Sequence, residues 1–165
     1  DEDYRLARLR DISVYISPLG SMADDKLADA FARLTDGAVG ERRVLKTQGR
    51  EVAMPRWAQG VGWFTFEELC ARPLGAADYI AIAEHCHTVI VAGIPRLGAE
   101  RRNEAMRFVT LIDELYEHKV KLICSAAAMP GQLYIEGDGA FEFERTVSRL
   151  MEMQSKNYLA AHHIE

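Results

Sequence analysis

The sequence predicts an α/β fold with one βαβ unit, whose strands are parallel, at its centre. Two short apolar runs rich in β-branched residues, at residues 88–92 and 120–124, have the composition and length of buried strands. Between them, over residues 100–118, apolar side chains recur at three- and four-residue spacing, which indicates a helix buried along one face. A helix of this length must cross back over the sheet. The two strands are therefore expected to lie parallel in one sheet.

The segment before this unit carries further periodicity and turn signals. The elements expected there are a strand at 12–16, a helix at 21–36, a β-hairpin at 42–54, a short strand at 63–66, a helical turn at 67–71 and a helix at 76–87. The first of these helices has a buried stripe of Leu27, Phe31 and Leu34 and ends at a glycine. The hairpin turn is expected at Gln48-Gly49.

The segment after the unit is expected to close the domain. It contains a turn at Pro130-Gly131, a short apolar run at 133–135, a polar loop at 136–139, a helix at 141–158 and a frayed tail at 160–165. With flanking helices and an added β-hairpin, residues 1–165 are predicted to form a single α/β domain. Residues 1–6 contain neither a turn nor a helix cap, so we expect the chain to be either cut from a longer protein or a processed product.

Composition excludes several functional classes. The formal charge is −5, the sequence pI is about 5.6 and no run of Lys or Arg exceeds two residues, so we expect no nucleic-acid partner. No apolar run approaches the roughly 18 to 20 residues that a membrane-spanning helix needs, so a soluble protein is expected. Cys70, Cys86 and Cys124 are widely spaced among apolar residues, which is typical of reduced core thiols in an intracellular protein.

The motifs of a nucleotide-hydrolysing site are missing from the sequence. The glycines at residues 37–40 lack the Gly-Lys-Ser/Thr of a phosphate loop, and the run at 93–98 has Pro95 where a flexible backbone donor is needed. The strand at 88–92 leads into Gly93 rather than into two magnesium-binding carboxylates. We therefore expect no catalytic residue in this segment and no ATP hydrolysis by the segment alone.

Two short segments contain residue types that are common in metal-binding or reactive sites, but a structural role is the favoured interpretation for both. Side chains in His85-Cys86-His87 point about 100° apart on a helix and no second ligand pair follows, so no metal site is expected. Cys124 lies at a strand end, where nucleophiles occur in open α/β sheets. The three alanines at 126–128 provide no base, so a buried structural thiol is the favoured interpretation.

Arginines gather in two places. One group surrounds the predicted start of the helix at 100–118 and consists of Arg96, Arg101, Arg102 and Arg107. Cations there oppose the helix dipole, which favours placement for partners, and a solvated face paired with nearby carboxylates is the alternative. Arg145 and Arg149 are four residues apart and share one face of the last helix, as side chains that bind an anion or a carboxylate would. For these two, packing against Glu142 and Glu152 is the alternative.

Several longer motifs resemble a known family. They are DYRL at residues 3–6, FTFEELCARPLGAADY at 64–79, RRNEAMRF at 101–108, LIDELY at 111–116 and FEFERTVSRLMEMQS at 141–155. Together they resemble the carboxyl-terminal part of the ZapE-type cell-division ATPases, bacterial relatives of the AFG-like mitochondrial ATPases within the AAA class. The βαβ unit also resembles the magnesium-binding half of an AAA core without its acidic residues.

The resemblance implies a carboxyl-terminal fragment of a longer P-loop ATPase that acts on protein partners, in cell division or in membrane-protein quality control. ATP and Mg would bind the parent protein upstream of residue 1, and no cofactor is expected for the fragment alone. The partners would be division-ring or membrane proteins, and a homo-oligomer is left open. A bacterial protein of this kind would be cytoplasmic or membrane-associated through partners, and a eukaryotic one mitochondrial.

The resemblance also directs attention to particular residues. The candidates for nucleotide sensing or subunit contact are first Arg145 and Arg149 and then Arg101, Arg102 and Arg107. An alternative function is a non-catalytic protein-binding module without nucleotide contact. In that case Trp57 and Trp63, with Val61, are expected to form an exposed apolar surface, because aromatic anchors are common in interfaces.

Overall fold

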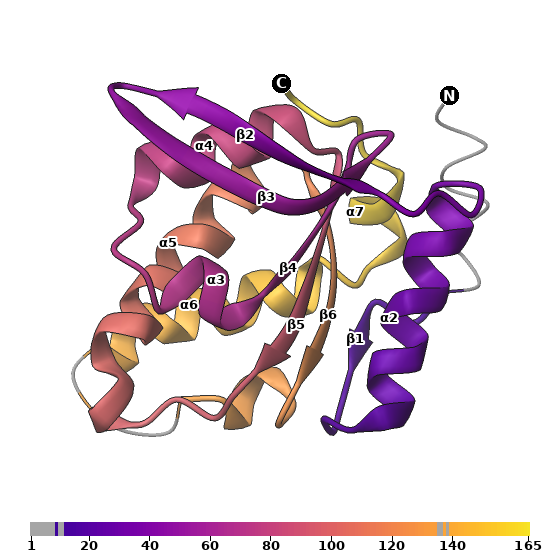
Figure 1. The fold of residues 1–165 in the computed structure, drawn as a ribbon. Helices are drawn as coiled ribbons and strands as arrows, with labels where there is room; N and C mark the ends of the chain where they lie inside the picture. The colour runs from indigo at the N-terminus through magenta and orange to yellow at the C-terminus, as the bar shows by residue number, and fades with distance from the viewer. Residues whose placement is uncertain (1–8, 10–11, 135–136, 138) are drawn as a thin grey trace.

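The computed structural model describes residues 9, 12–134, 137 and 139–165 and shows an α/β fold around a six-stranded mixed sheet (Figure 1). The strand order is β1-β6-β5-β4-β3-β2, with parallel pairs from β1 to β4 and antiparallel pairs from β4 to β2. The strands are β1 (Tyr15–Ile16), β2 (Glu41–Thr47), β3 (Arg50–Ala58), β4 (Val61–Thr65), β5 (Thr88–Ile94) and β6 (Lys121–Ala126).

Helices cover both faces of the sheet. They are α2 (Ser21–Leu34), α3 (Phe66–Cys70), α4 (Ala76–His85), α5 (Arg102–Glu117), α6 (Ala140–Glu152) and α7 (Lys156–Ala160), with short 3-10 turns η1 (Ala99–Arg101) and η2 (Pro130–Gln132). Helix α2 lies on one face and α3 to α6 lie on the other (Figure 1). Successive side chains of the central strands therefore alternate between two apolar clusters, one on each face of the sheet.

The predicted βαβ unit is confirmed as β5, α5 and β6. Strands β5 and β6 are adjacent and parallel, with Val89 opposite Leu122 and Val91 opposite Cys124. Both strands are buried on both faces, which explains why their sequences are continuous apolar runs rather than alternating ones. The α5 stripe faces inward, and Phe108 at its centre is fully buried.

The hairpin β2–β3 is longer than predicted and turns where expected. Gln48 and Gly49 have φ values of 44° and 79°, so both central residues adopt the left-handed conformation of the hairpin turns that match strand twist. Farther along, Arg43 pairs with Met54 whereas Glu41 pairs with Trp57. The extra residue in β3 is a β-bulge, a position that accommodates the Pro in this strand.

Two predicted features at the carboxyl end are wrong. The helix expected at 141–158 is split into α6 and α7, because the Ser155 hydroxyl accepts a hydrogen bond from the Tyr158 N–H at 3.1 Å and caps a new helix. The tail at 160–165 is attached rather than frayed. The Ile164 N–H donates to the His118 carbonyl at 2.8 Å, and the buried Lys121 ammonium donates to the Ala161 carbonyl at 2.7 Å.

Other predicted boundaries shift by a few residues. The strand expected at 12–16 is reduced to β1, and the helix expected at 76–87 ends at His85. Residues 1–6, residue 135 of the short apolar run and residues 136 and 138 of the polar loop lie outside the described part of the chain.

Phe108 provides a direct test of the packing between α5 and its neighbours. Its ring lies 5.9 Å from that of Phe66 and 6.1 Å from that of Phe143. We expect Phe108→Ala to lower the free energy of unfolding by about 3 to 5 kcal/mol, because the cavity is too enclosed to collapse. Urea unfolding followed by circular dichroism measures the change.

The matched control is Phe141→Ala, because Phe141 lies in the first turn of α6 and is 80% exposed. This substitution should change the free energy of unfolding by less than about 0.5 kcal/mol. Equal losses in the two variants would show that α5 and α6 are not packed as described.

Candidate functional site

The candidate site lies where α5 begins, beyond the carboxyl end of β5 (lower left of Figure 1). Functional groups of open α/β sheets collect at this end of the strands. A hollow of about 400 Å³ lies there, lined by Ala99, Glu100, Arg101, Arg102, Asn103, Glu104 and Arg107. Three of the five arginines predicted to contact nucleotide or a subunit therefore line one hollow.

The chain that leads to the hollow is held by backbone contacts. At the end of β5 the Gly93 backbone adopts a positive φ of 80°, and its N–H donates to the Ser125 hydroxyl at 2.9 Å. Beyond it, the buried Leu97 donates its N–H to the Leu133 carbonyl at 2.7 Å. These contacts to β6 and to the segment after it fix the direction in which η1 and α5 leave the sheet.

The arginines of this hollow differ in what they contact. Arg101 forms ion pairs with Glu104 at 3.2 Å and with Glu67 at 3.5 Å. The Arg107 guanidinium donates to the Cys70 carbonyl at 2.9 Å. A carbonyl is a neutral acceptor, so this hydrogen bond orients Arg107 without neutralising its charge.

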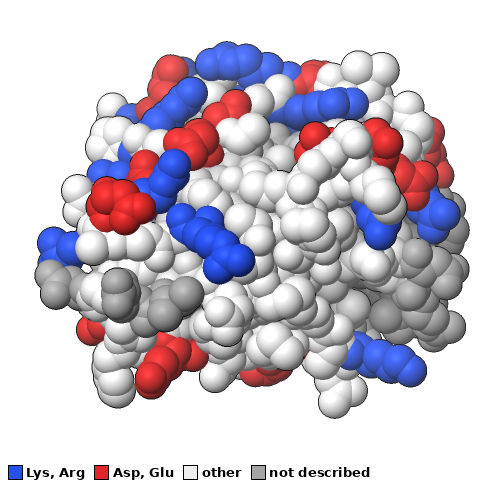
Figure 2. Space-filling view, turned by 90° about the horizontal axis from the view of Figure 1, so that it is seen from below, with Lys and Arg blue, Asp and Glu red and all other residues white. Residues whose placement is uncertain are grey.

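A second hollow, of about 510 Å³, adjoins the first. Its lining residues are Arg96, Leu97, Gly98, Ala99, Glu100, Gln132 and Leu133. The two hollows share Ala99 and Glu100, so Arg96 lies at the same end of α5 as the other three arginines. Figure 2, which views the molecule from this side, shows Lys and Arg side chains interspersed with Asp and Glu rather than a continuous basic surface.

Arg145 and Arg149 lie elsewhere and are bound to a carboxylate. Arg145 donates to Oδ2 of Asp113 at 2.9 Å and Arg149 donates to Oδ1 at 2.5 Å. Arg149 also lies 4.6 Å from the Tyr116 ring centroid and 3.7 Å from Glu117. Asp113 thus joins α6 to α5. This pairing replaces the one considered with Glu142 and Glu152.

Sequence reasoning missed Asp113 because the pair spans two helices. Asp113 is separated from Arg145 by 32 residues and from Arg149 by 36 residues. The available signal was that Asp113 follows the buried Ile112 at the edge of the α5 stripe, where a polar side chain can reach a neighbouring helix.

Trp57 and Trp63 lie on opposite faces of the sheet. The Trp57 side chain packs on the α4 side, where its Nε1 donates to the His85 carbonyl at 3.4 Å. The Trp63 ring lies on the α2 side, with its centroid 5.3 Å from that of Phe31. Both tryptophans are half-buried and Val61 is fully buried. They do not form one apolar surface together.

The cysteine thiols are buried in the apolar core. Cys70, Cys86 and Cys124 are free and buried, and burial raises the pKa of the Cys86 thiol to about 12. Burial also raises the pKa of Cys124, so the nucleophilic thiolate is not accessible at neutral pH. Among the described residues no group of three His, Cys, Asp or Glu side chains is placed to hold a metal ion.

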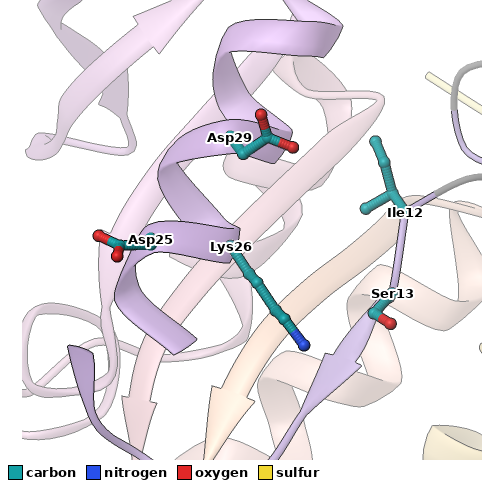
Figure 3. Close-up of a pocket in the computed structure, with 5 residues that line it drawn as sticks. All are labelled: Ile12, Ser13, Asp25, Lys26 and Asp29. Atoms are coloured by element: carbon teal, nitrogen blue, oxygen red, sulfur yellow. The ribbon is translucent and has the colours of Figure 1, made fainter. Parts of the chain in front are cut away.

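A hollow of about 330 Å³ between β1 and α2 is a weaker candidate. Ile12, Ser13, Asp25, Lys26 and Asp29 line it. In Figure 3 Lys26 extends toward Ser13, whereas Asp25 points to the other side of α2. Asp29 forms an ion pair with Arg33 at 3.0 Å on the helix surface. The polar groups therefore do not converge on one point.

Comparison with known proteins identifies the family. Residues 1–162 match the family described as AFG1-like ATPase. The chain belongs to this family. It is 34% identical over 163 residues to "Cell division protein ZapE" of Escherichia coli K12, covering 98% of this chain and 43% of the relative. It is 36% identical over 148 residues to "Lactation elevated protein 1 homolog B" of Danio rerio, covering 70% of this chain and 29% of the relative.

The chain spans less than half of the length of these curated relatives. No solved structure matches it. Within the described ranges of this AFG1-like ATPase chain, no helix has the length and apolar character needed to span a membrane.

Asp113→Ala tests whether Asp113 joins the two helices. We expect the free energy of unfolding to fall by about 1 to 2 kcal/mol, because both arginines lose a charged acceptor that is partly shielded from solvent. Urea unfolding measures this loss.

Glu117→Ala is the matched control on the same helix, because Glu117 is more exposed and lies 3.7 Å from Arg149. Its loss should stay below about 0.5 kcal/mol. A larger effect at Glu117 than at Asp113 would contradict the described pairing.

Proposed function

We propose that this chain is the carboxyl-terminal portion of an ATP-hydrolysing AFG1-like ATPase that acts on protein partners. Family membership and the partial coverage of the relatives support this proposal. Nucleotide and Mg²⁺ would bind the remaining part of the parent protein, and this chain would supply positive charge toward it. The observation that carries the proposal is the hollow at the start of α5, which is lined by three arginines.

Arginine is suited to this role because its charge does not titrate and its planar fork matches phosphate oxygens. In P-loop hydrolysis, charge that develops on the transferred phosphoryl group is commonly stabilised by an arginine supplied from the same or another chain. Arg102 and Arg107, which line the hollow, would contact the nucleotide or a neighbouring subunit. Arg101 would hold the first turn of α5 in place through its ion pairs with Glu67 and Glu104.

We place Arg145 and Arg149 second for this role. The two guanidinium groups share the Asp113 carboxylate, and Arg149 also contacts Glu117. To bind phosphate, Arg149 would first have to leave a paired and partly buried position, which costs free energy, and the more exposed Arg145 would also have to leave its ion pair. The acceptor of the Arg107 hydrogen bond is the neutral Cys70 carbonyl, so breaking this bond separates no pair of opposite charges.

The partners proposed for the whole protein are proteins of the division ring or of membranes. The name of the Escherichia coli relative supports cell division. For a bacterial source we propose action in the cytoplasm, with membrane association through partners, and for a eukaryotic source action in mitochondria. Subunit contact through the arginine-lined hollow would require a homo-oligomer.

ATP hydrolysis by the parent protein, with its upstream portion present, tests the proposal. We expect Arg102→Ala to lower kcat at least roughly tenfold and KM for ATP to stay within about threefold, because the arginine acts mainly on charge that develops during the reaction. Arg102→Lys should recover only part of the rate, since lysine lacks the planar fork.

Arg33→Ala is the matched control, because Arg33 is an exposed arginine on α2 that forms an ion pair with Asp29 on the same helix. It should keep kcat within about twofold. A large loss in Arg149→Ala that Asp113→Asn does not share, with Arg102→Ala fully active, would transfer the role to Arg149. Hydrolysis by residues 1–165 alone would contradict the assignment of the nucleotide site to the parent.

A further inference from the structure

Strand β2 is the outer strand of the described sheet and pairs with β3 on one side only. The β2–β3 hairpin extends over α4 at the top of Figure 1. An outer strand presents a row of backbone N–H and C=O groups that an extended chain can use for strand addition. β2 has seven residues, a length of roughly 23 Å at about 3.3 Å per residue.

The register identifies which backbone groups face outward. The two-residue turn at Gln48-Gly49 makes Thr47 and Arg50 the first hydrogen-bonded pair. Hydrogen-bonded and non-hydrogen-bonded pairs alternate in an antiparallel ladder, so Leu45 bonds to β3 and the residues on either side do not. The N–H and C=O groups of Val44 and Lys46, and of Arg42 beyond them, therefore face away from β3.

The strand is held in position before any partner arrives. Leu45, Val52 and Met54 are buried on the α4 side of the hairpin. Near the turn, Arg50 donates to the Pro73 carbonyl at 3.0 Å and lies 3.4 Å from the buried Asp78 carboxylate. A preformed edge reduces the entropy that strand addition would otherwise lose.

The charge of β2 is opposite to that of the whole chain. β2 contains three basic residues and one acidic residue, whereas the chain has a net charge of −5. Arg43 is already engaged, with Glu41 at 3.2 Å and the Trp57 ring centroid at 4.1 Å. Arg42 and Lys46 are exposed, on the face opposite Leu45, and flank Val44.

This arrangement disfavours a second copy of β2 as the occupant. Antiparallel pairing of two β2 strands centred on Val44 would place each Arg42 directly opposite a Lys46. Like charges in directly opposed positions destabilise a strand pair. Carboxylates in the same positions would be attracted instead, so the edge selects an acidic strand and rejects its own copy.

We propose that β2 is a docking strand for an extended acidic segment of a partner protein, which adds to the sheet at Arg42, Val44 and Lys46. The segment would carry carboxylates opposite Arg42 and Lys46 and an apolar side chain opposite Val44. This inference goes beyond the ATPase proposal, because it uses no residue of the arginine-lined hollow. Peptide binding and ATP hydrolysis can therefore fail independently.

A fluorescein-labelled, end-blocked peptide with the core Glu-Thr-Val-Thr-Glu tests the proposal by fluorescence anisotropy at low salt. We expect the full chain to bind it at least roughly tenfold more tightly than a peptide with lysine in place of glutamate. Replacing both Arg42 and Lys46 by Glu should reverse this preference. Equal binding of the two peptides, or no binding of either, would overturn the proposal.

Val44→Pro removes an outward N–H that the β2–β3 ladder does not use, so the fold should tolerate it as an edge-strand proline. It should weaken acidic-peptide binding at least roughly tenfold, whereas Val44→Thr, which keeps the N–H, should stay within about twofold. Unchanged affinity in Val44→Pro would contradict strand addition. Sedimentation of the wild type as a dimer that Val44→Pro dissociates would assign the edge to a second copy.

Amide hydrogen exchange of the wild type gives a test that requires no substitution. In the free chain the Val44 and Lys46 amides should exchange quickly and the Leu45 amide slowly. The acidic peptide should slow exchange at Val44 and Lys46 and leave Leu45 unchanged. Unchanged exchange at all three positions under saturating peptide would show that it binds elsewhere.

Discussion

The structure depends on burying both faces of β5 and β6 beneath helices on either side of the sheet. The parallel crossover through α5 satisfies this constraint on one face, with Phe108 packed between Phe66 and Phe143. This crossover sets the path of α5. It also places the first turn of α5, and the hollow beside that turn, beyond the end of β5. Helix α6 packs on α5 and carries the last part of the chain back to β6, where Lys121 holds the Ala161 carbonyl.

The charge of the hydrogen-bond acceptor distinguishes Arg149 on α6 from Arg107 on α5. A guanidinium paired with a partly buried carboxylate mainly stabilises the packing between helices, as Arg149 does with Asp113. A guanidinium that is oriented by a neutral carbonyl, as Arg107 is by Cys70, keeps its charge for another partner. Arg149 is therefore suited to packing between helices and Arg107 to ligand contact, although Arg145 and Arg149 ranked first in the sequence analysis.

Local patterns predicted most of the fold, because β-branched runs, helical periodicity and Gln48-Gly49 act over a few residues. Such patterns do not predict contacts between elements that are distant in the sequence. The partner of Arg149 lies on another helix, and the bulge in β3 shifts the alternation so that Trp57 and Trp63 face opposite sides. The split of the last helix followed from one serine cap, a signal present in the sequence but outweighed by the apolar stripe around it.

A structure of the whole parent protein with a non-hydrolysable ATP analogue would test the account most directly. The measured quantity is the distance from each arginine to the phosphate oxygens. We predict that Arg102 or Arg107 lies within about 3 Å of a phosphate oxygen or of a neighbouring subunit at that site, while Arg149 remains on Asp113. A hollow at the start of α5 that faces only solvent, or a phosphate held by Arg149, would contradict the account.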